Sequence, residues 1–344
     1  MNKRKITMVC VTAAVVIAVF LAGVLIAVLL GNMQYSGYVR VDVPTSGATS
    51  LPTQITQPAT ESPTEPQVTE PPVTELPATQ PPETKPPSTG PTGYPAGGDQ
   101  LIGKLYTRDQ LAAIDGTRKG YGAGQSSNGM RPSYAVSNQK AHGDLYNTYF
   151  IAPDNGKVYL TFSHGYEQDN LTAIVLDTLK EKGIKAVFFI NRDYARLAPD
   201  MVWRMINEGH IVGNHATKHP DMGQQTVDQM VSEIMTMHNY MVENFNYEMT
   251  LFRPPSGYYS VRLLAVAQSL GYTTVQWSYT YRDWDKSVPP DYDTFLSDIV
   301  ESAHSGAIYY FHTVTPSGVA AICDSIDEIL AKGYEIDLFT GEFE

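Results

Sequence analysis

The chain has 344 residues, of which 42% are hydrophobic and 17% are charged, and its formal net charge is −12 at pH 7. An acidic chain with no basic stripe cannot displace the counterions of a phosphate backbone, which excludes nucleic acid as an expected partner. The length allows one large folded domain together with a segment that has no core of its own. Composition does not indicate an oligomeric state.

The first 30 residues predict a membrane anchor. Residues 6–30 contain no charge, and about 25 uncharged residues at about 1.5 Å each span a hydrocarbon layer of roughly 30 Å. A cleaved signal peptide is the alternative, but its apolar core is usually only about 7 to 15 residues long. Basic residues lie within 1–5 and none follows until Arg40. We therefore expect a cytoplasmic tail at 1–5, a single span at 6–30, and the rest on the cell-wall side of the cell membrane.

Residues 31–98 predict a disordered linker outside the membrane. The part from 44 to 98 holds 14 of the 23 prolines, many threonines, five glutamates and one lysine. Such a segment favours polyproline II and stays solvated, so it forms no core. Two interpretations remain open: a stalk that reaches into a cell wall, or a spacer without a target.

The two cysteines cannot form a disulfide within the folded part. Cys10 lies in the expected membrane span and Cys323 stands alone in the folded part. Cys323 lies in an apolar helical pattern, which predicts a small core residue.

From 99 to 156 the chain is rich in Gly, Ser, Asn and Tyr, and we expect loops that wrap the domain, with a short helix at 107–114. The pattern then becomes regular. Apolar runs predict seven strands, at 157–162, 186–190, 210–213, 251–253, 273–278, 307–311 and, weakly, 334–336. Helices are predicted at 169–182, from Pro199 to Gly209, and at 261–270. This alternation predicts an α/β domain over 157–344, with a parallel sheet that closes like a barrel.

Polar residues follow five of the predicted strands. In α/β barrels the active site is built at the carboxyl ends of the strands, so side chains placed there are expected to converge on one site. Placement after five different strands is hard to attribute to chance. The residues in question are Ser163, His164, Glu167, His215, His219, Arg253, Asp283, Trp284 and His312.

His215 and His219 form an H-x-x-x-H pair at the end of the predicted strand at 210–213. Alone, this spacing is a weak signal, because histidine pairs four residues apart are common on surface helices. Neutral imidazole is a good ligand for zinc and other divalent transition metals, and a third ligand is then expected from elsewhere in the chain.

Five segments resemble the motifs of the polysaccharide deacetylases (NodB homology, carbohydrate esterase family 4) in order and spacing: 161–167 (TFSHGYE), 214–220 (NHATKHP), 253–257 (RPPSG), 282–284 (RDW) and 310–312 (YFH). The Gly-Tyr-Glu at 165–167 and the Gly-Tyr-Gly-Ala-Gly at 120–124 are similar to the subgroup of peptidoglycan muramic acid de-N-acetylases that make δ-lactam. The resemblance implies an irregular (β/α)7 barrel and a divalent metal, often zinc, held by two histidines and an aspartate. It carries the two histidines onto His215 and His219.

The first motif departs from the family pattern. Where the family has an aspartate as general base and a second aspartate or an asparagine after it, this chain has Ser163 and His164. A serine hydroxyl near its ordinary pKa is a poor base, and the loss of a general base typically costs about 10² to 10⁴ in rate. His164 can complete a three-histidine metal site, which would make a bound water more acidic. Glu167 is either a surrogate base or a structural residue.

The resemblance implies roles for the other site residues. His312 matches the general acid that protonates the leaving amine, the alternative being a core histidine. The family's arginine at the position of Arg253 bonds the base carboxylate; with Ser163 in that place, we expect Arg253 to turn to Asp283, which orients groups at the site. Two roles are open for Trp284, Tyr258 and Tyr259. These aromatic residues either form an apolar wall for the acetyl and sugar groups of a substrate or simply pack within the fold.

Three functions remain open from the sequence. The first is a membrane-anchored, extracytoplasmic, metal-dependent de-N-acetylase of cell-wall peptidoglycan or a related N-acetylated glycan, with zinc, cobalt or manganese as the metal. The second is a catalytically silent deacetylase fold that binds wall glycan or scaffolds partners, with Ser163 as the lesion. The third is an esterase that uses the same site on O-acetyl groups. Retention of His215, His219, Arg253 and His312 together favours the enzyme.

Overall fold

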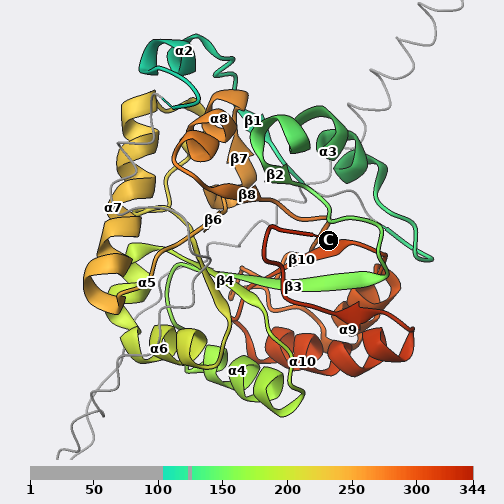
Figure 1. Cartoon of the computed structure of the whole chain (residues 1–344). Coiled ribbons are helices and arrows are strands. Elements are labelled where there is room, and N and C mark those ends of the chain that lie inside the picture. The colour runs from blue at the N-terminus through green and yellow to red at the C-terminus, as the bar shows by residue number, and fades with distance from the viewer. Residues whose placement is uncertain (1–103, 123–125, 344) are drawn as a thin grey trace, which may run out of the picture. The chain divides into compact units, whose positions relative to one another are not determined.

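The computed structural model describes residues 104–122 and 126–343 (Figure 1). The expected cytoplasmic tail, membrane span and linker, at 1–98, lie outside the described residues. Within those two ranges no helix combines the length and apolar character that crossing a membrane requires.

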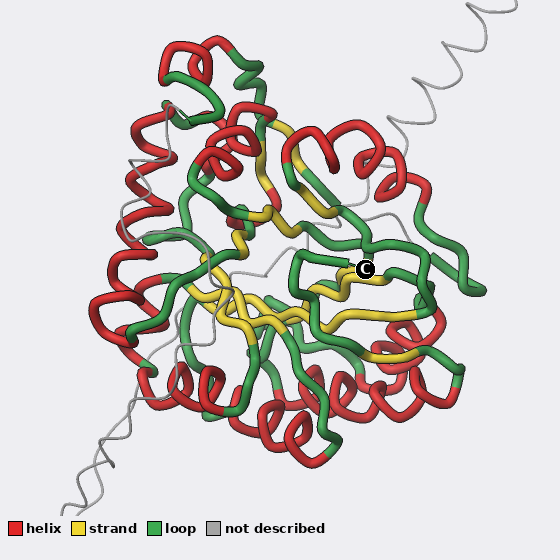
Figure 2. The backbone as a smooth tube through the Cα atoms, in the orientation of Figure 1, coloured by secondary structure: helices red, strands yellow, loops and turns green. Residues whose placement is uncertain are grey.

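A curled parallel sheet organises the described chain (Figure 2). Its strand order is β2-β8-β6-β5-β4-β3-β10-β9, with β11 also paired to β3, and every pairing in it is parallel. All seven strands expected from the sequence are present. The strands are β2 (Thr148–Tyr149), β3 (Lys157–His164), β4 (Val187–Ile190), β5 (Ile211–Asn214), β6 (Leu251–Phe252), β8 (Thr273–Val275), β9 (Tyr279–Thr280), β10 (Ala307–Phe311) and β11 (Glu335–Ile336).

The helices lie around the outside of this sheet (Figure 2). Their starts follow ordinary capping chemistry: Thr226 forms a capping box with Gln229, and Pro316 occupies the first turn after the cap residue Thr315. The helices that follow β3 in the chain are α4 (Leu171–Glu181), α5 (Arg192–Leu197), α6 (Pro199–Asn207), α7 (Val227–Phe245), α8 (Val261–Ser269), α9 (Tyr292–Glu301) and α10 (Pro316–Ala331). Cys323, on α10, belongs to the buried core, as the sequence predicted.

The segment from β8 to β9 connects the part of the curled sheet around β8 with the part around β10. The amides of Thr274 and Gln276 donate to Asn147 O and Tyr149 O, on the side where β2 and β6 flank β8. Two residues later the Ser278 amide donates to Ile308 O of β10, and β9 then pairs with β10. One bent stretch of chain therefore runs across the opening between the ends of the sheet, and the backbone carbonyls at its bend are available to a side chain from inside.

The lead-in is more ordered than the sequence predicted. The expected short helix is present as α2 (Arg108–Ala113), and β1 (Lys119–Gly120) pairs with β7 (Tyr258–Tyr259). Beyond these, the lead-in forms α3 (Ser133–Tyr146) and supplies β2 to the main sheet. The prediction of loops was wrong for α3 because this helix has no apolar stripe: its buried residues are only Ala135 and Gly143.

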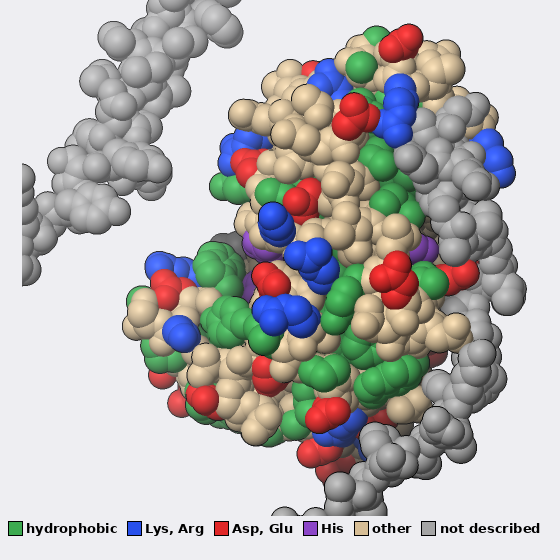
Figure 3. All heavy atoms as spheres, turned by 90° about the vertical axis from the view of Figure 1, so that its left-hand side faces the viewer, with side chains coloured by type: hydrophobic (Ala, Val, Ile, Leu, Met, Phe, Trp, Pro, Cys, Tyr) green, Lys and Arg blue, Asp and Glu red, His purple; other side chains and the backbone are tan. Residues whose placement is uncertain are grey.

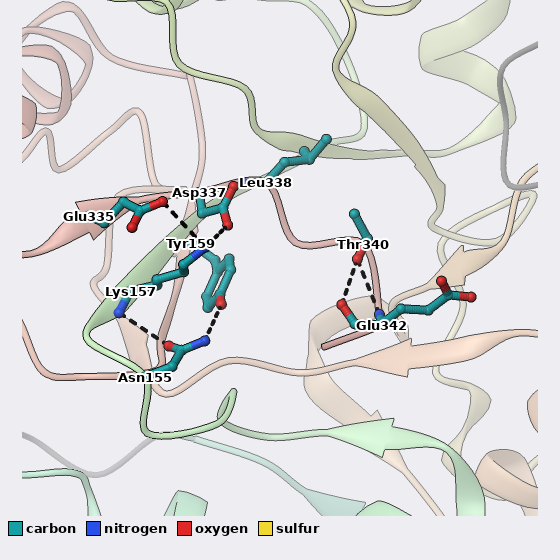
Figure 4. A network of polar contacts seen from close by, with 8 residues as sticks. All are labelled: Asn155, Lys157, Tyr159, Glu335, Asp337, Leu338, Thr340 and Glu342. Carbon is teal, nitrogen blue, oxygen red and sulfur yellow. Dashed lines mark hydrogen bonds and ion pairs between the residues drawn. The ribbon is translucent and has the colours of Figure 1, made fainter. Parts of the chain in front are cut away.

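The amino end of β3 is tied to the carboxyl-terminal part of the chain (Figure 4). Lys157 Nζ lies 2.6 Å from Asp337 Oδ2 and 3.3 Å from Glu335 Oε1, and Asn155 Nδ2 donates to Tyr159 OH at 3.1 Å. Such part-exposed ion pairs contribute at most about 1 kcal/mol each. They lie at the opposite end of β3 from Ser163 and His164, so they support the strand without entering the site.

Acidic and basic side chains are interspersed on the face seen in Figure 3, which carries α7 and α5.

The core lies between the sheet and its helices: from Val158 to His164 every residue of β3 is buried, and Phe162 stacks on Phe188 of β4 with ring centroids 5.0 Å apart. A rigid core of this kind is what places the strand ends accurately.

Candidate active site

The carboxyl ends of β3, β5 and β10 meet at one edge of the sheet. Ser163 and His164 are the last residues of β3, His215 directly follows β5, and His312 directly follows β10. The register places His164 beside Ile190 of β4, and Ile190 beside Asn214 of β5. The convergence expected from the sequence is therefore present for these three strands.

A tight loop, and not a helix, carries the pair His215 and His219. His219 and Ala216 both have positive φ, 57° and 64°, so the chain folds back on itself within five residues. Asn214 Oδ1 accepts the Ala216 amide at 2.9 Å, and Glu233 Oε2 of α7 accepts the amides of Thr217 and Lys218 at 3.0 Å each. These bonds hold the loop against α7. The ring centroids of His215 and His219 lie 4.9 Å apart.

His215 is prepared to bind a metal through one nitrogen. Its Nδ1–H donates to Arg253 O at 2.8 Å, which leaves the lone pair on Nε2. Nε2 is buried and has no hydrogen-bond partner within the described ranges. Burial, with a smaller contribution from His219, holds the pKa of His215 well below its ordinary value; partial desolvation of the ring also lowers the pKa of His219, although that residue is exposed overall. Both imidazoles are thus neutral near pH 7, the form that divalent metals bind.

His164 faces a threonine pair. Its Nε2 lies 3.0 Å from Thr313 Oγ1, which lies 2.9 Å from Thr172 Oγ1, and its ring packs 4.9 Å from that of Tyr194. Burial lowers the pKa of His164 to about 3, so the ring is neutral, and Nδ1 has no partner among the residues described. In 104–122 and 126–343, no three His, Cys, Asp or Glu side chains are grouped so as to hold a metal. The role of His164 as third ligand stays a prediction.

Asp283 holds His312 by two hydrogen bonds. The Nδ1–H of His312 donates to Asp283 Oδ1 at 2.8 Å, and the His312 amide donates to Oδ2 at 2.7 Å. Asp283 is buried and His312 is largely buried. The imidazole is therefore fixed in orientation and tautomer, with Nε2 left for a reacting group, as a general acid requires.

Arg253 does not turn to Asp283, so that expectation was wrong. Its side chain is completely buried and points to the bend between β8 and β9, where Nε donates to Val275 O at 3.0 Å and Nη2 to Gln276 O at 3.1 Å. Nη2 also donates to Thr161 Oγ1 at 2.8 Å. The bend places two backbone carbonyl oxygens within hydrogen-bond distance of the guanidinium. Burial lowers the pKa of Arg253 to about 9.

Ser163 and Glu167 differ in their surroundings. The Ser163 hydroxyl is buried and has no hydrogen-bond partner in the described chain. Glu167 accepts the Thr172 amide at the start of α4 at 3.2 Å and the Tyr194 hydroxyl at 2.8 Å. Both carboxylate oxygens of Glu167 are thus engaged in joining α4 to α5, which is the structural role that the sequence left open beside that of a surrogate base.

The three aromatic residues expected at a substrate wall separate into two groups. Trp284 is 50% exposed and its ring centroid lies 6.0 Å from that of His312. Tyr259 is buried and donates to Asn138 Oδ1 at 3.1 Å, and the guanidinium of Arg118 lies 3.5 Å from the ring centroid of Tyr258. Only Trp284 combines exposure with a contact to the site; the two tyrosines pack against the lead-in.

Sequence reasoning missed the supporting residues Thr313 and Tyr194, and it gave no separate role to Tyr310, a residue of the 310–312 motif. Thr313 directly follows that motif, so its position was a usable signal. Tyr194 lies on α5, 30 residues after His164 in the chain, and no local pattern marks its contact with that histidine.

Comparison with known proteins agrees with this geometry. The polysaccharide deacetylase family model matches residues 151–275. The peptidoglycan-N-acetylmuramic acid deacetylase PdaA of Bacillus subtilis is 34% identical over 193 residues, which are 56% of this chain and 73% of that protein. The solved structure of Bacillus subtilis PdaA, a family 4 carbohydrate esterase, has a TM-score of 0.62 at 29% identity and covers 65% of this chain and 96% of its own. A family 4 carbohydrate esterase from Bacillus anthracis has a TM-score of 0.54 at 28% identity, covering 66% and 96%. The chain belongs to the polysaccharide deacetylase family, carbohydrate esterase family 4, whose members are hydrolases that act on carbon–nitrogen bonds.

Proposed function

We propose that this chain removes acetyl groups from the amino sugars of cell-wall peptidoglycan or a related N-acetylated glycan. The observation that carries the proposal is the placement of two elements at one edge of the sheet: the neutral pair His215 and His219, and the dyad of His312 with Asp283. The similarity to a peptidoglycan deacetylase, PdaA, supports peptidoglycan as the substrate class.

A divalent metal, zinc in our proposal, belongs with the histidine pair. His215 Nε2 is buried, carries a free lone pair and has no hydrogen-bond partner in the described part of the chain, which fits a metal-ligand position. When bound, such a metal polarises a carbonyl and makes water more acidic. The chain's contribution is to hold both imidazoles neutral, and to set the tautomer of His215 through Arg253 O.

The remaining residues orient the substrate and move a proton. His312 donates the proton from Nε2 to the nitrogen that leaves as the carbon–nitrogen bond breaks, and Asp283 stabilises the charged and neutral imidazole in one orientation. Trp284, exposed beside His312, offers an apolar face for the sugar ring. The carbonyl bearing the acetyl methyl is thereby directed toward the strand ends.

The proposed location rests on the amino-terminal sequence. The uncharged segment 6–30, with basic residues only before it, supports a single-pass anchor with the catalytic domain on the cell-wall side. The linker 31–98 then extends the reach of the domain toward wall glycan.

The test is acetate release by the purified full-length chain from N-acetylated peptidoglycan fragments, with zinc, cobalt or manganese supplied. We expect release that is abolished in His215→Ala and retained in His142→Ala, a part-buried histidine of α3. Use of O-acetylated and N-acetylated fragments side by side distinguishes the amidase from an esterase.

A silent, glycan-binding protein is the second candidate, and Ser163 at the position of the family's base is the observation that favours it. Absence of acetate release under every metal, together with release by the double variant Ser163→Asp with His164→Asn, would establish the silent protein instead. Retained glycan binding in the unaltered chain would complete that result.

A further inference from the structure

The guanidinium of Arg253 has two N–H groups without an acceptor. Arginine carries five N–H donors, one on Nε and two on each terminal nitrogen. The Nε donor goes to Val275 O, and the two Nη2 donors go to Thr161 Oγ1 and Gln276 O. Nη1 is buried and, among the described residues, no atom accepts from it. Three donors are therefore used to hold the side chain, and two remain.

The ring of Tyr310 lies close to Arg253 and to two further hydrogen-bond donors, those of Ser163 and Trp277. Arg253 Cζ stands 4.8 Å from the ring centroid of Tyr310 and 5.8 Å from that of Trp277, and these two rings are 4.3 Å apart. Burial raises the pKa of Tyr310 to about 12, and the Ser163 side chain, close to the phenol, lowers that pKa as a hydrogen-bonding neighbour. The Ser163 hydroxyl and Trp277 Nε1 are both buried, and neither bonds to any residue in the described ranges. Three residues that carry hydrogen-bond donors, Arg253, Ser163 and Trp277, thus lie near Tyr310.

The charge of Arg253 is not compensated by an ion pair with any residue that the structure describes. Arg253 is completely buried, its hydrogen bonds go only to neutral oxygens, and no carboxylate within the described chain forms an ion pair with it. An uncompensated buried charge is costly, and a bound anion relieves that cost. The faces of Phe189 and Tyr310, at 4.2 and 4.8 Å from Cζ, compensate for it only in part.

We propose that Arg253 Nη1 and the Ser163 hydroxyl bind a small carboxylate anion from solution, of the size of formate or acetate. A carboxylate fits better than a spherical anion because it has two oxygens, one for the guanidinium and one for the hydroxyl. Ser163 stands where the family has its aspartate base, so the bound anion supplies the carboxylate that this chain does not encode.

The catalytic consequence rests on the proposed deacetylase function. A water molecule gives a proton to the bound carboxylate as its oxygen bonds to the acetyl carbon. The carbon–nitrogen bond then breaks, His312 gives its proton to the departing nitrogen, and the free amine leaves together with acetic acid, which loses its proton to solvent to become acetate. The carboxylic acid returns its proton through solvent to His312, which balances the cycle.

Binding is tested first, without substrate, by the broadening of the ¹³C-formate resonance on addition of the full-length chain at constant ionic strength. Formate is never a product of deacetylation. Its binding would therefore show that an ion taken from solution, and not only a reaction product, can occupy the site. We expect saturable broadening that chloride does not displace at equal concentration and that acetate does displace. Absence of broadening overturns the proposal.

Two matched substitutions locate the site. Ser163→Asp places a carboxylate beside Arg253, and like charge should weaken formate binding by roughly tenfold or more. Ser133→Asp adds the same charge at an exposed position at the start of α3 and should leave formate binding unchanged. Equal formate binding in all three proteins overturns the assignment to Arg253 and Ser163.

Activity then decides the role of the anion. We expect acetate release by the unaltered chain to rise saturably with formate, and Ser163→Asp to be active without formate and insensitive to it. Formate binding without any rise, while Ser163→Asp is active, overturns the role as base. If no variant releases acetate under any condition, the proposed function fails, whereas the formate titration still decides whether the anion site exists.

Discussion

One carboxylate, that of Asp283, accepts hydrogen bonds from both the backbone amide and the Nδ1–H of His312. They are 29 positions apart in the chain, all of α9 lies between them, and the contact brings the loop after β9 against the end of β10. The position of the imidazole is therefore set twice, once through its backbone and once through its ring. This arrangement makes Asp283 the residue on which the proposed general acid depends.

Asp283→Asn is expected to lower the rate of acetate release by roughly 10² to 10³, because an amide has one oxygen for two donors and the orientation of His312 is lost. The unsatisfied donor should also cost about 1 to 3 kcal/mol of unfolding free energy. Steady-state kinetics and urea denaturation measure the two effects. The control is Asp298→Asn, which alters the carboxylate bonded to Tyr279 OH and should lower stability only. Equal loss of activity in both variants would contradict a special role for Asp283.

His215→Ala is expected to weaken zinc binding by at least about a hundredfold, because a ligand is lost. His142→Ala should not change zinc affinity. Equilibrium dialysis of the full chain against a zinc buffer measures it. His164→Ala in the same assay decides the third ligand: an unchanged affinity would show that the three-histidine prediction is wrong.

The substitution Glu167→Gln distinguishes a structural role of Glu167 from a role as catalytic base. Because both oxygens of Glu167 are bonded, to the Thr172 amide and the Tyr194 hydroxyl, we expect a loss of about 1 kcal/mol in unfolding free energy. The rate of acetate release should stay close to that of the unaltered chain. A fall in rate of about 10² or more would identify Glu167 as the surrogate base.

Acid should destabilise the domain through His304. Burial lowers its folded-state pKa to about 4, whereas the unfolded chain titrates near its ordinary value of about 6.5. As the pH falls below the unfolded value, the unfolded state binds protons that the folded state does not, so stability is lost until the pH reaches the folded value. The contribution between pH 7.5 and pH 5 is about 2 kcal/mol. His304→Gln should flatten the pH dependence of urea unfolding by that amount; an unaltered slope would refute the assignment.

Trp284→Ala is expected to raise KM for glycan fragments several-fold with a change in unfolding free energy within about 0.5 kcal/mol, since half of the side chain is exposed. Leu197→Ala, at a residue that is 63% exposed, is the matched control and should alter neither quantity. If KM is the same in both variants, the glycan does not contact Trp284.

The sequence by itself determined seven of the nine strands described in the main sheet, with β2 and β9 missed, and also the order of the motifs and the end of the sheet where they meet. These features depend on local patterns: an apolar run predicts a strand, and His215 or His312 directly after one must lie at its carboxyl end. Parallel pairing then brings separate strand ends together without any knowledge of side-chain contacts. The same local reasoning failed for α3, whose composition has no apolar stripe.

Only the tertiary structure decided the surroundings of each functional side chain. Arg253 bonds to carbonyls at the bend after β8 and to Thr161, which is 92 residues earlier in the chain. Glu167 turns to Tyr194, a residue that no motif marks. The physical reason is that a buried polar group bonds to whichever partner the packing of distant strands and helices places within about 3 Å, and spacing along the chain does not encode that distance.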